Sequence, residues 1–336
     1  MFERILVPLD GSTHSHQALP YAVLVARCCS SELVLAHVTP QPASTALTPD
    51  DVAAEMGERP RAAGVPFQPS PADRMFLADP GRRTDAHIIA DVERASDEVE
   101  ALRRRLTEQG LTVRTVVRGG PPAETLLDIG REEAIELIVM STHGRGGIGR
   151  FLLGSVADRV VRHADVPVML VRTAAVHREN PEFKRIVVPL DGSQTAAAVL
   201  PAVRELARCS GAEIVLLRVV QGEPAAPVIT ALPPPEGVVE KHGAAEREAT
   251  AYVGTVEQSA VGWGVPVRTL VQVGDPASVI LDTAKDLYAD LIVMSTHGLG
   301  GLRRFFLGSV AERVVRHAEA PVLVFRTPTP PVASPA

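Results

Sequence analysis

The sequence is short of the features that mark membrane-bound, secreted and nucleic-acid-binding proteins. It contains no apolar run close to the roughly 20 residues that a membrane-spanning helix needs. Its first residues, 1–4, lead directly into a strand pattern and not into the apolar core of a signal peptide. The net charge of -6 offers no general attraction for nucleic acid or for an anionic membrane. We therefore expect a cytoplasmic protein with no nucleic-acid or membrane partner.

Cysteine is also scarce, because the chain has only 3. Cys28 and Cys209 occupy equivalent positions of an internal repeat, both within predicted helices, and Cys29 corresponds to Ser210. Cysteines on helices commonly pack as small apolar residues. We expect buried structural thiols here, and neither a disulfide framework nor a redox site.

The sequence lacks the usual motifs of fast phosphoryl and acyl transfer. It has no Walker A segment ending in Gly-Lys-Ser/Thr, no Cys/His spacing typical of a metal site and no nucleophile elbow. We therefore predict no catalytic residue and no metal ligand, and the function is more consistent with binding than with rapid catalysis.

The chain does contain a duplication. The segment 5–12, which ends in Asp-Gly-Ser, recurs almost letter for letter at 186–193, and most positions of 141–173 are repeated from 295 onwards. A length of 336 residues suits two domains of ordinary size. The predicted organisation is a first domain, a linker, a second domain and a disordered tail, at 1–173, 174–182, 183–327 and 328–336.

Each half alternates apolar, β-favouring runs with amphipathic helical patterns, which is typical of a parallel sheet covered by helices. The predicted fold class is α/β, with two tandem Rossmann-like domains that each hold an open five-stranded, mainly parallel sheet. The proline-containing segment 39–83 has no sustained period and is predicted to be a long irregular loop. Strands are predicted in the first domain at 5–9, 33–38, 113–117, 135–140 and 167–171, and helices at 16–29, 86–108, 123–132 and 154–164.

Chemistry-bearing residues follow two of these predicted strands. Asp10 ends the first strand, and a Ser-Thr-His-Gly turn at 141–144 ends the fourth. Ligands of open parallel sheets bind at the carboxyl ends of the strands, where the winding reverses. Glycine N–H groups and a helix N-terminus at Gly154-Ser155 suit phosphate, and the carboxylate suits ribose or base. The pattern predicts a nucleoside triphosphate site, although Asp10 as a simple helix cap stays open.

The combination of a strand ending VPLDGS, a Gly-x-Pro turn, and VMSTHG followed nine residues later by GSV resembles the universal stress protein family over nearly all of both halves. In the ATP-binding branch the motif is Gly, two residues, Gly, nine residues, then Gly and Ser or Thr. It maps onto Ser141, Gly144 and Gly154-Ser155, and onto Ser295, Gly298 and Gly308-Ser309, so serine replaces the first glycine twice. The resemblance implies a strand order of 3-2-1-4-5 and a pseudo-dimer of the two domains joined through the fifth strands. A homodimer of whole chains is a further expectation that the sequence leaves open.

The resemblance further implies that Asp10 and Asp191 contact the nucleoside, that Val38 and Val219 line the adenine pocket, and that the turns at Gly120 and Gly274 border the site. The predicted ligand is ATP, alone or with Mg, and the predicted role is a nucleotide-dependent sensor or regulator in stress response. Two alternatives remain open: a slow ATPase, with His143 and Asp10 as the candidate base and metal ligand, and a nucleotide-free dimerisation scaffold. Arg150, Arg303 and Arg304 could add positive charge. The full set of predicted ATP contacts is Pro8, Leu9, Asp10, Val38, Gly120, Met140, Ser141, His143, Gly144, Arg145, Gly154, Ser155, Val156, Pro189, Leu190, Asp191, Val219, Gly274, Met294, Ser295, His297, Gly298, Gly308, Ser309 and Val310.

Overall fold

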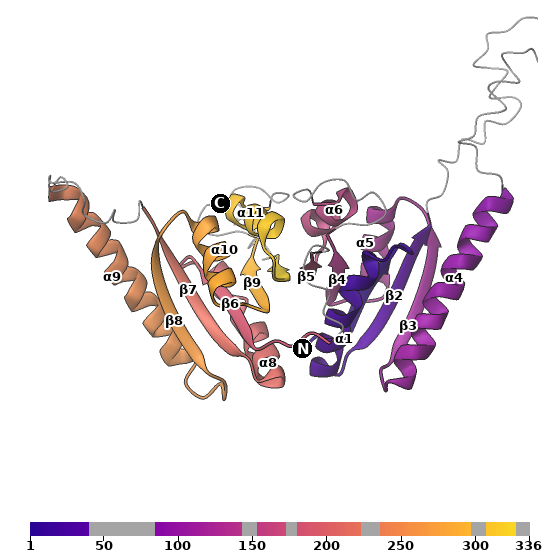
Figure 1. Cartoon of the computed structure of the whole chain (residues 1–336), viewed down its shortest axis with the longest axis horizontal. Helices are drawn as coiled ribbons and strands as arrows, with labels where there is room; N and C mark the ends of the chain where they lie inside the picture. Colours follow the sequence, from indigo (N-terminus) through magenta and orange to yellow (C-terminus); the bar gives the residue numbers. More distant parts are fainter. Residues whose placement is uncertain (40–84, 143–152, 173–179, 223–235, 297–306, 327–336) are drawn as a thin grey trace, which may run out of the picture.

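The computed structural model describes residues 1–39, 85–142, 153–172, 180–222, 236–296 and 307–326 (Figure 1). Almost all of the predicted loop 39–83 lies outside these ranges, as do the tail and most of the linker. Thr39 is the exception, because it ends a strand and does not begin a loop. Within the described ranges, no helix combines the length and the apolar composition needed to cross a membrane.

The first domain alternates strands and helices as the sequence pattern predicts. The predicted helix 16–29 is divided, since a short 3-10 turn comes before the α-helix. Pro20 lies in the first turn of that α-helix, where its missing N–H costs no helical hydrogen bond. The elements are β1 (Arg4–Leu9), η1 (Ser15–Ala18), α1 (Leu19–Cys29), β2 (Glu32–Thr39), α4 (Asp85–Glu108), β3 (Val113–Gly119), α5 (Pro122–Glu132), β4 (Leu137–Ser141), α6 (Ser155–His163) and β5 (Val168–Val171).

The second domain repeats this order. Its elements are β6 (Arg185–Leu190), α7 (Gln194–Ala197), α8 (Leu200–Ser210), β7 (Glu213–Gln221), α9 (Glu236–Ser259), β8 (Val267–Gly274), α10 (Pro276–Asp286), β9 (Leu291–Ser295), α11 (Ser309–His317) and β10 (Val322–Phe325).

The strands of both domains form one 10-stranded sheet, in the order β3-β2-β1-β4-β5-β10-β9-β6-β7-β8. The predicted order 3-2-1-4-5 is therefore confirmed in each domain. Neighbouring strands within a domain are parallel, and β5 pairs antiparallel with β10 at the centre. Met169 pairs with Leu323, its own equivalent in the repeat, so a pseudo-twofold axis passes through this pair. The expected pseudo-dimer through the fifth strands is confirmed.

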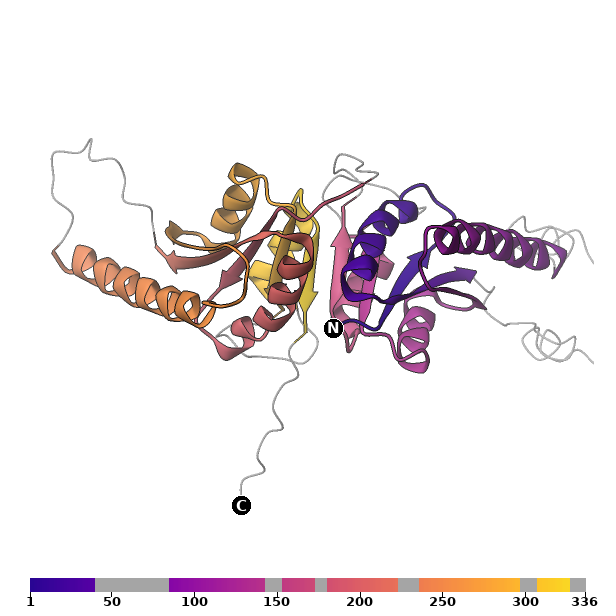
Figure 2. The ribbon, with the colours of Figure 1, turned by 90° about the horizontal axis from the view of Figure 1, so that it is seen from below.

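Two hydrophobic cores cover the two faces of the sheet, because side chains alternate between faces along a strand. Ile5 and Leu33 point to the face covered by α1, α4, α8 and α9. Leu6 and Val34 point to the face covered by α5, α6, α10 and α11. Figure 2 shows the two domains side by side, with the long helices α4 and α9 at the outer ends of the molecule.

The cysteine prediction is wrong in one respect, because Cys28 and Cys209 form a disulfide that links the two domains. Helices α1 and α8 pack against each other beside the pseudo-twofold axis. Two equivalent residues can touch only when they lie close to such an axis, and the repeat pattern alone does not say where the axis passes. Cys29 is the free cysteine and is half-buried, and this burial raises the pKa of its thiol.

Candidate functional site

The predicted site residues gather at the carboxyl ends of adjacent strands. β2, β1 and β4 are neighbours in the sheet, and they end beside Val38, Asp10 and Ser141. The chain leaves β1 for β2 on one side, while β4 pairs with β1 on the other. The winding therefore reverses between β1 and β4, which is the point where ligands bind in open parallel sheets.

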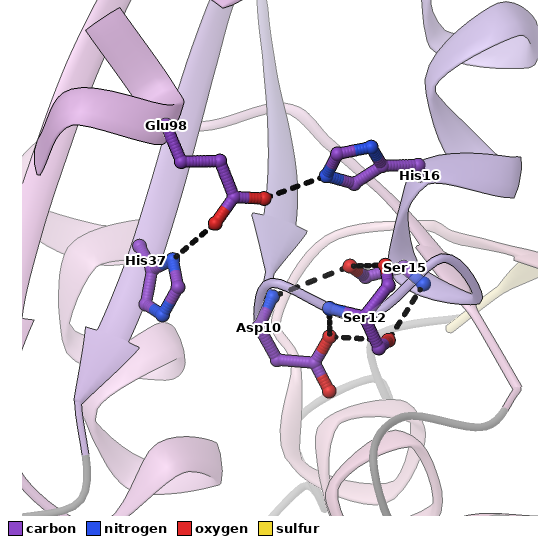
Figure 3. Close-up of polar contacts among 6 residues, drawn as sticks. All are labelled: Asp10, Ser12, Ser15, His16, His37 and Glu98. Carbon is purple, nitrogen blue, oxygen red and sulfur yellow. Dashed lines mark hydrogen bonds and ion pairs between the residues drawn. The ribbon is translucent and has the colours of Figure 1, made fainter. Parts of the chain in front are cut away.

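A tight turn holds Asp10 just beyond β1 (Figure 3). The backbone N–H and the hydroxyl of Ser12 both donate to Asp10 Oδ1, at 3.0 Å and 2.6 Å. Gly11 has a φ of 74°, a left-handed conformation that favours glycine. The turn closes when the N–H of Ser15 donates to Ser12 Oγ at 3.1 Å. The carboxylate is thus fixed in direction by bonds to one of its two oxygens.

The second domain repeats this turn closely. The N–H and hydroxyl of Ser193 donate to Asp191 Oδ1 at 2.9 Å and 2.6 Å, and Ser193 Oγ accepts from the N–H of Ala196 as the N-cap of α7. The serine therefore caps the helix in place of the aspartate. In the first domain the N–H of Ser15 donates to Ser12 Oγ in the same way, but the N-cap of η1 is His14 and that helix start has no side-chain cap bond among the described residues.

The helix after β4 begins without a side-chain cap. Gly154 is the N-cap of α6 and Gly308 that of α11, and neither helix start has a side-chain cap bond among the described residues. By contrast, Asp275 caps α10 by accepting from the N–H of Ser278 at 2.9 Å. An uncapped helix N-terminus presents N–H donors and a partial positive charge of about half a unit.

One predicted detail of this phosphate cradle is wrong. The N–H of Gly154 donates to the carbonyl oxygen of Thr142 at 2.8 Å, and that of Gly308 donates to Thr296 at 2.9 Å. These glycines therefore do not offer their own N–H groups to a ligand. Gly308 is needed for close packing, since a Cβ there would lie 2.8 Å from the Thr296 carbonyl oxygen. The next N–H groups, those of Ser155 and Val156 in α6, are the donors that an anion would meet.

Apolar side chains form the other wall. Val38 and Met140 belong to one buried cluster on the face covered by α5 and α6, and Val219 and Met294 do so in the second domain. Leu9 belongs instead to the core on the opposite face, as does its counterpart Leu190. Their side chains therefore do not meet Val38 and Val219, and any contact of Leu9 or Leu190 with a ligand would be through the backbone.

Of the remaining predicted site residues, some lie within the described ranges and others lie outside them. Gly120 follows β3, and its N–H donates to the Thr39 oxygen at 3.0 Å, next to Val38. Pro8 and Pro189 are within β1 and β6, Gly274 ends β8, and Ser295 ends β9. Ser309 and Val310 begin α11. The residues that lie outside the described ranges are His143, Gly144, Arg145, Arg150, His297, Gly298, Arg303 and Arg304.

The structure also places a polar cluster that the sequence did not predict. Glu98 of α4 lies between two histidine rings, with its Oε1 2.7 Å from His16 Nε2 and its Oε2 3.7 Å from His37 Nδ1 (Figure 3). The Asp10 carboxylate points away from this cluster. The contact between Glu98 and His16 links the segment that follows Asp10 to α4. A comparison of the two copies could have signalled these positions, because the second domain has other residue types there.

The cluster of Glu98, His16 and His37 is not arranged as a metal site. Within the described ranges, no group of three or more His, Cys, Asp or Glu side chains is arranged to hold a metal ion. The chemistry available at the described strand ends is that of a fixed carboxylate, an apolar wall and helix N–H donors. Such a set can bind a polar ligand that carries an anionic group.

Comparisons with known proteins agree with this architecture. The model of the universal stress protein family matches residues 1–172 and 182–326. Universal stress protein Rv2005c of Mycobacterium tuberculosis is 26% identical over 332 residues, covering 96% of each chain. Universal stress protein MJ0531 of Methanocaldococcus jannaschii is 37% identical over 147 residues, covering 44% of this chain and 84% of its own. A universal stress protein structure from Archaeoglobus fulgidus aligns with a TM-score of 0.66 at 20% identity, covering 96% of this chain and 98% of the other. The chain therefore belongs to the universal stress protein family, with two tandem domains of that family in one polypeptide.

Proposed function

We propose that each domain binds one ATP between the ends of β1 and β4 in the first domain, and of β6 and β9 in the second. Asp10 and Asp191 would bind the ribose or the base, and the N-termini of α6 and α11 would bind the phosphates. The bound nucleotide would control the protein as a sensor or regulator in stress response. Mg would accompany the phosphates without a dedicated protein site.

One observation carries this proposal. In both domains the helix after the fourth strand of the domain starts without a side-chain cap bond. The adjacent strand ends at an aspartate whose carboxylate is held by a serine hydroxyl, and both copies of the repeat have this bond. An anion at a helix N-terminus is favoured by roughly 0.3–1 kcal/mol before direct hydrogen bonds are counted. The serine at the first glycine position of the motif does not disturb this geometry, because Ser141 and Ser295 are buried at the ends of β4 and β9.

A binding role fits the described residues better than rapid catalysis. A general base must lie within hydrogen-bond reach of the proton that it removes. Asp10 already accepts two hydrogen bonds from Ser12 on one oxygen, and these bonds hold the carboxylate in a fixed orientation that suits ligand binding. The candidate base His143 lies outside the described ranges. Slow hydrolysis of bound ATP is therefore the alternative function of the same site.

The test places a negative charge where the phosphates would bind. Ser155→Asp with Ser309→Asp puts a carboxylate in the first turn of α6 and α11, where it stabilises the helix through the macrodipole. It should also repel triphosphate, and roughly 1,000-fold weaker ATP binding is expected, because two like charges roughly 4 Å apart near a protein surface repel by about 4 kcal/mol. Isothermal titration calorimetry with ATP and Mg measures the affinity and the number of sites. Because the substitution favours the helix, loss of binding would not result from unfolding.

Two controls sharpen this test. Thr250→Asp adds the same charge on the exposed part of α9, and it should leave ATP affinity unchanged. Ser155→Ala with Ser309→Ala removes only the hydroxyls and should weaken ATP binding modestly. Undiminished binding of two ATP molecules by the double aspartate variant would place the phosphates elsewhere. Purified wild-type protein that binds no ATP at all would favour the nucleotide-free scaffold.

A further inference from the structure

The Asp-Gly-Ser turn is followed by different side chains in the two domains. Ser15 and His16 come after the turn in the first domain, and their counterparts in the second are Ala196 and Ala197. An alanine side chain can neither donate nor accept a hydrogen bond. The contacts that Ser15 and His16 make through their side chains therefore belong to the first domain alone.

The hydroxyl of Ser15 joins the two ends of the Asp10 turn. It donates to the carbonyl oxygen of Ser12 at 2.9 Å and accepts from the backbone N–H of Asp10 at 3.3 Å (Figure 3). Ser15 is buried, so these bonds lie in a low-dielectric environment that strengthens them. They hold the backbone at the start and at the end of the turn, and this backbone sets the position of the Asp10 carboxylate.

The next residue, His16, ties this turn to helix α4. Its Nε2 lies 2.7 Å from Oε1 of Glu98, whose other oxygen lies 3.7 Å from Nδ1 of His37 in β2. One carboxylate thus contacts both the strand beside β1 and the segment that follows β1. Tyr252 of α9 corresponds to Glu98, since the buried positions around the two residues repeat with the same spacing. The second domain therefore has neither the histidine nor the carboxylate of this contact.

These contacts prepare the turn for a ligand. A binding group that is already held in its bound position loses less conformational entropy when the ligand arrives. The Asp10 carboxylate points away from His16 and Glu98 (Figure 3), so these two residues act on the site through the turn and not by touching a ligand beside the carboxylate.

We propose that Ser15, His16 and Glu98 are positioning residues that raise the affinity of the first domain for the nucleoside part of ATP, and that the second domain binds without such residues. The assignment rests on the proposed function, in which Asp10 meets the ribose or the base. Coupling between two sites is reciprocal, so bound nucleotide strengthens the contact between His16 and Glu98 in turn. Occupancy of the first site is thereby transmitted to α4, while α9 has no equivalent contact.

The test isolates the first site in the full chain with Ser309→Asp, which is designed to block the second. ATP and inorganic tripolyphosphate are titrated calorimetrically, because they differ by the adenosine that Asp10 would hold. Ser15→Ala, His16→Ala and Glu98→Ala should each weaken ATP binding about 3- to 10-fold, as the loss of one hydrogen bond predicts. Tripolyphosphate binding should be unchanged, because the N-terminus of α6 holds the phosphates in the proposed function.

Control variants separate this role from a general effect on the fold. His16→Gln keeps an N–H donor for Glu98 and should retain most of the affinity for ATP. Glu100→Ala removes a carboxylate of the same helix that pairs with Arg103, and it should have no effect on binding. His16→Ala combined with Glu98→Ala should weaken binding little more than either change alone, because both remove the same contact.

Hydrogen exchange gives a second readout in the chain without the Ser309 substitution. Saturation with ATP should slow the exchange of backbone amides more in α4 than in α9, and this difference should disappear in His16→Ala.

The outcomes distinguish the positioning role from the proposed function. Unchanged ATP affinity in all three alanine variants would overturn this inference and leave the proposed function intact. A parallel loss of ATP and tripolyphosphate binding, or an equal loss in Glu100→Ala, would also overturn it, because either result would indicate a general weakening of the domain. If His16→Gln binds as weakly as His16→Ala, the hydrogen bond to Glu98 does not position the turn. Failure of the wild-type protein to bind ATP would overturn the proposed function and this inference together.

Discussion

Reduction of the disulfide between Cys28 and Cys209 should lower the free energy of unfolding without separating the two domains. The bond joins α1 to α8 across a sequence separation of 181 residues. The domains are also joined by the pairing of β5 with β10, and Arg172 donates to the His317 carbonyl oxygen at 3.1 Å. These contacts do not depend on the thiols, so the folded arrangement should persist after reduction.

The magnitude follows from the length of chain that the bond closes. In the chain-entropy description, a closed loop of 181 residues lowers the entropy of the unfolded state enough to stabilise the fold by about 5 kcal/mol. Unfolding entropies of globular proteins are about 2.1 cal/mol/K per residue, so for 336 residues unfolding together the loss corresponds to a decrease in Tm of roughly 7 °C. This is an upper value, because residual structure in the unfolded chain reduces the entropic gain.

The assay is calorimetric unfolding of oxidised and reduced protein, accompanied by peptide mapping under non-reducing conditions. Cys29→Ser removes the free thiol and should keep both the disulfide and the redox-dependent Tm. Cys28→Ser should unfold at the lower temperature under either condition and should no longer respond to reductant. The raised pKa of Cys29 means that little of it is thiolate near neutral pH, so exchange with the neighbouring disulfide should be slow.

Two results would refute this reasoning. Titration of two free thiols in oxidised, unfolded Cys29→Ser protein would show that the bond does not form. An equal decrease in Tm when reductant is added to wild type and to Cys28→Ser would show that the effect has another cause. A disulfide is rare in reducing compartments, and there the two thiols would simply pack against each other.

Two further predictions concern stability. Gly11→Ala should lower the free energy of unfolding in urea by about 1–2 kcal/mol, because the φ of 74° is a left-handed conformation in which a Cβ crowds the following carbonyl oxygen. A much smaller decrease would mean that the turn changes its conformation to accommodate alanine. The pKa of Asp275 lies below its usual value, first because of the bond from the backbone N–H of Ser278. A carboxyl with a depressed folded-state pKa stabilises the fold above its unfolded pKa and loses this contribution as pH falls through the folded one. In Asp275→Asn the free energy of unfolding should therefore decrease less steeply as the pH falls from about 5 to about 2. An unchanged pH dependence of the free energy of unfolding in this range would contradict the assignment.

Much of the fold could be predicted because its signals are local. Alternating apolar runs and helical patterns gave the order of strands and helices, and the near-identity of 5–12 with 186–193 gave the duplication. Strand ends are also local features, so Asp10 and Ser141 could be assigned to the same edge of the sheet. The helix start at Ser155 was predictable from Gly-Ser before an amphipathic pattern. The direction of the Gly154 N–H was not, because it depends on the path of the chain after β4.

The sequence by itself determined the family, the two-domain repeat and the carboxylate and helix start that face each other at the switch point. Only the tertiary structure decided which distant residues meet. Cys28 touches Cys209 because both lie near the pseudo-twofold axis, and a repeat does not reveal where its axis passes. Glu98 meets His16 and His37 because α4 packs on β2 with one particular rotation about the helix axis. Such contacts depend on the register between elements far apart in the chain, which periodicity within each element does not specify.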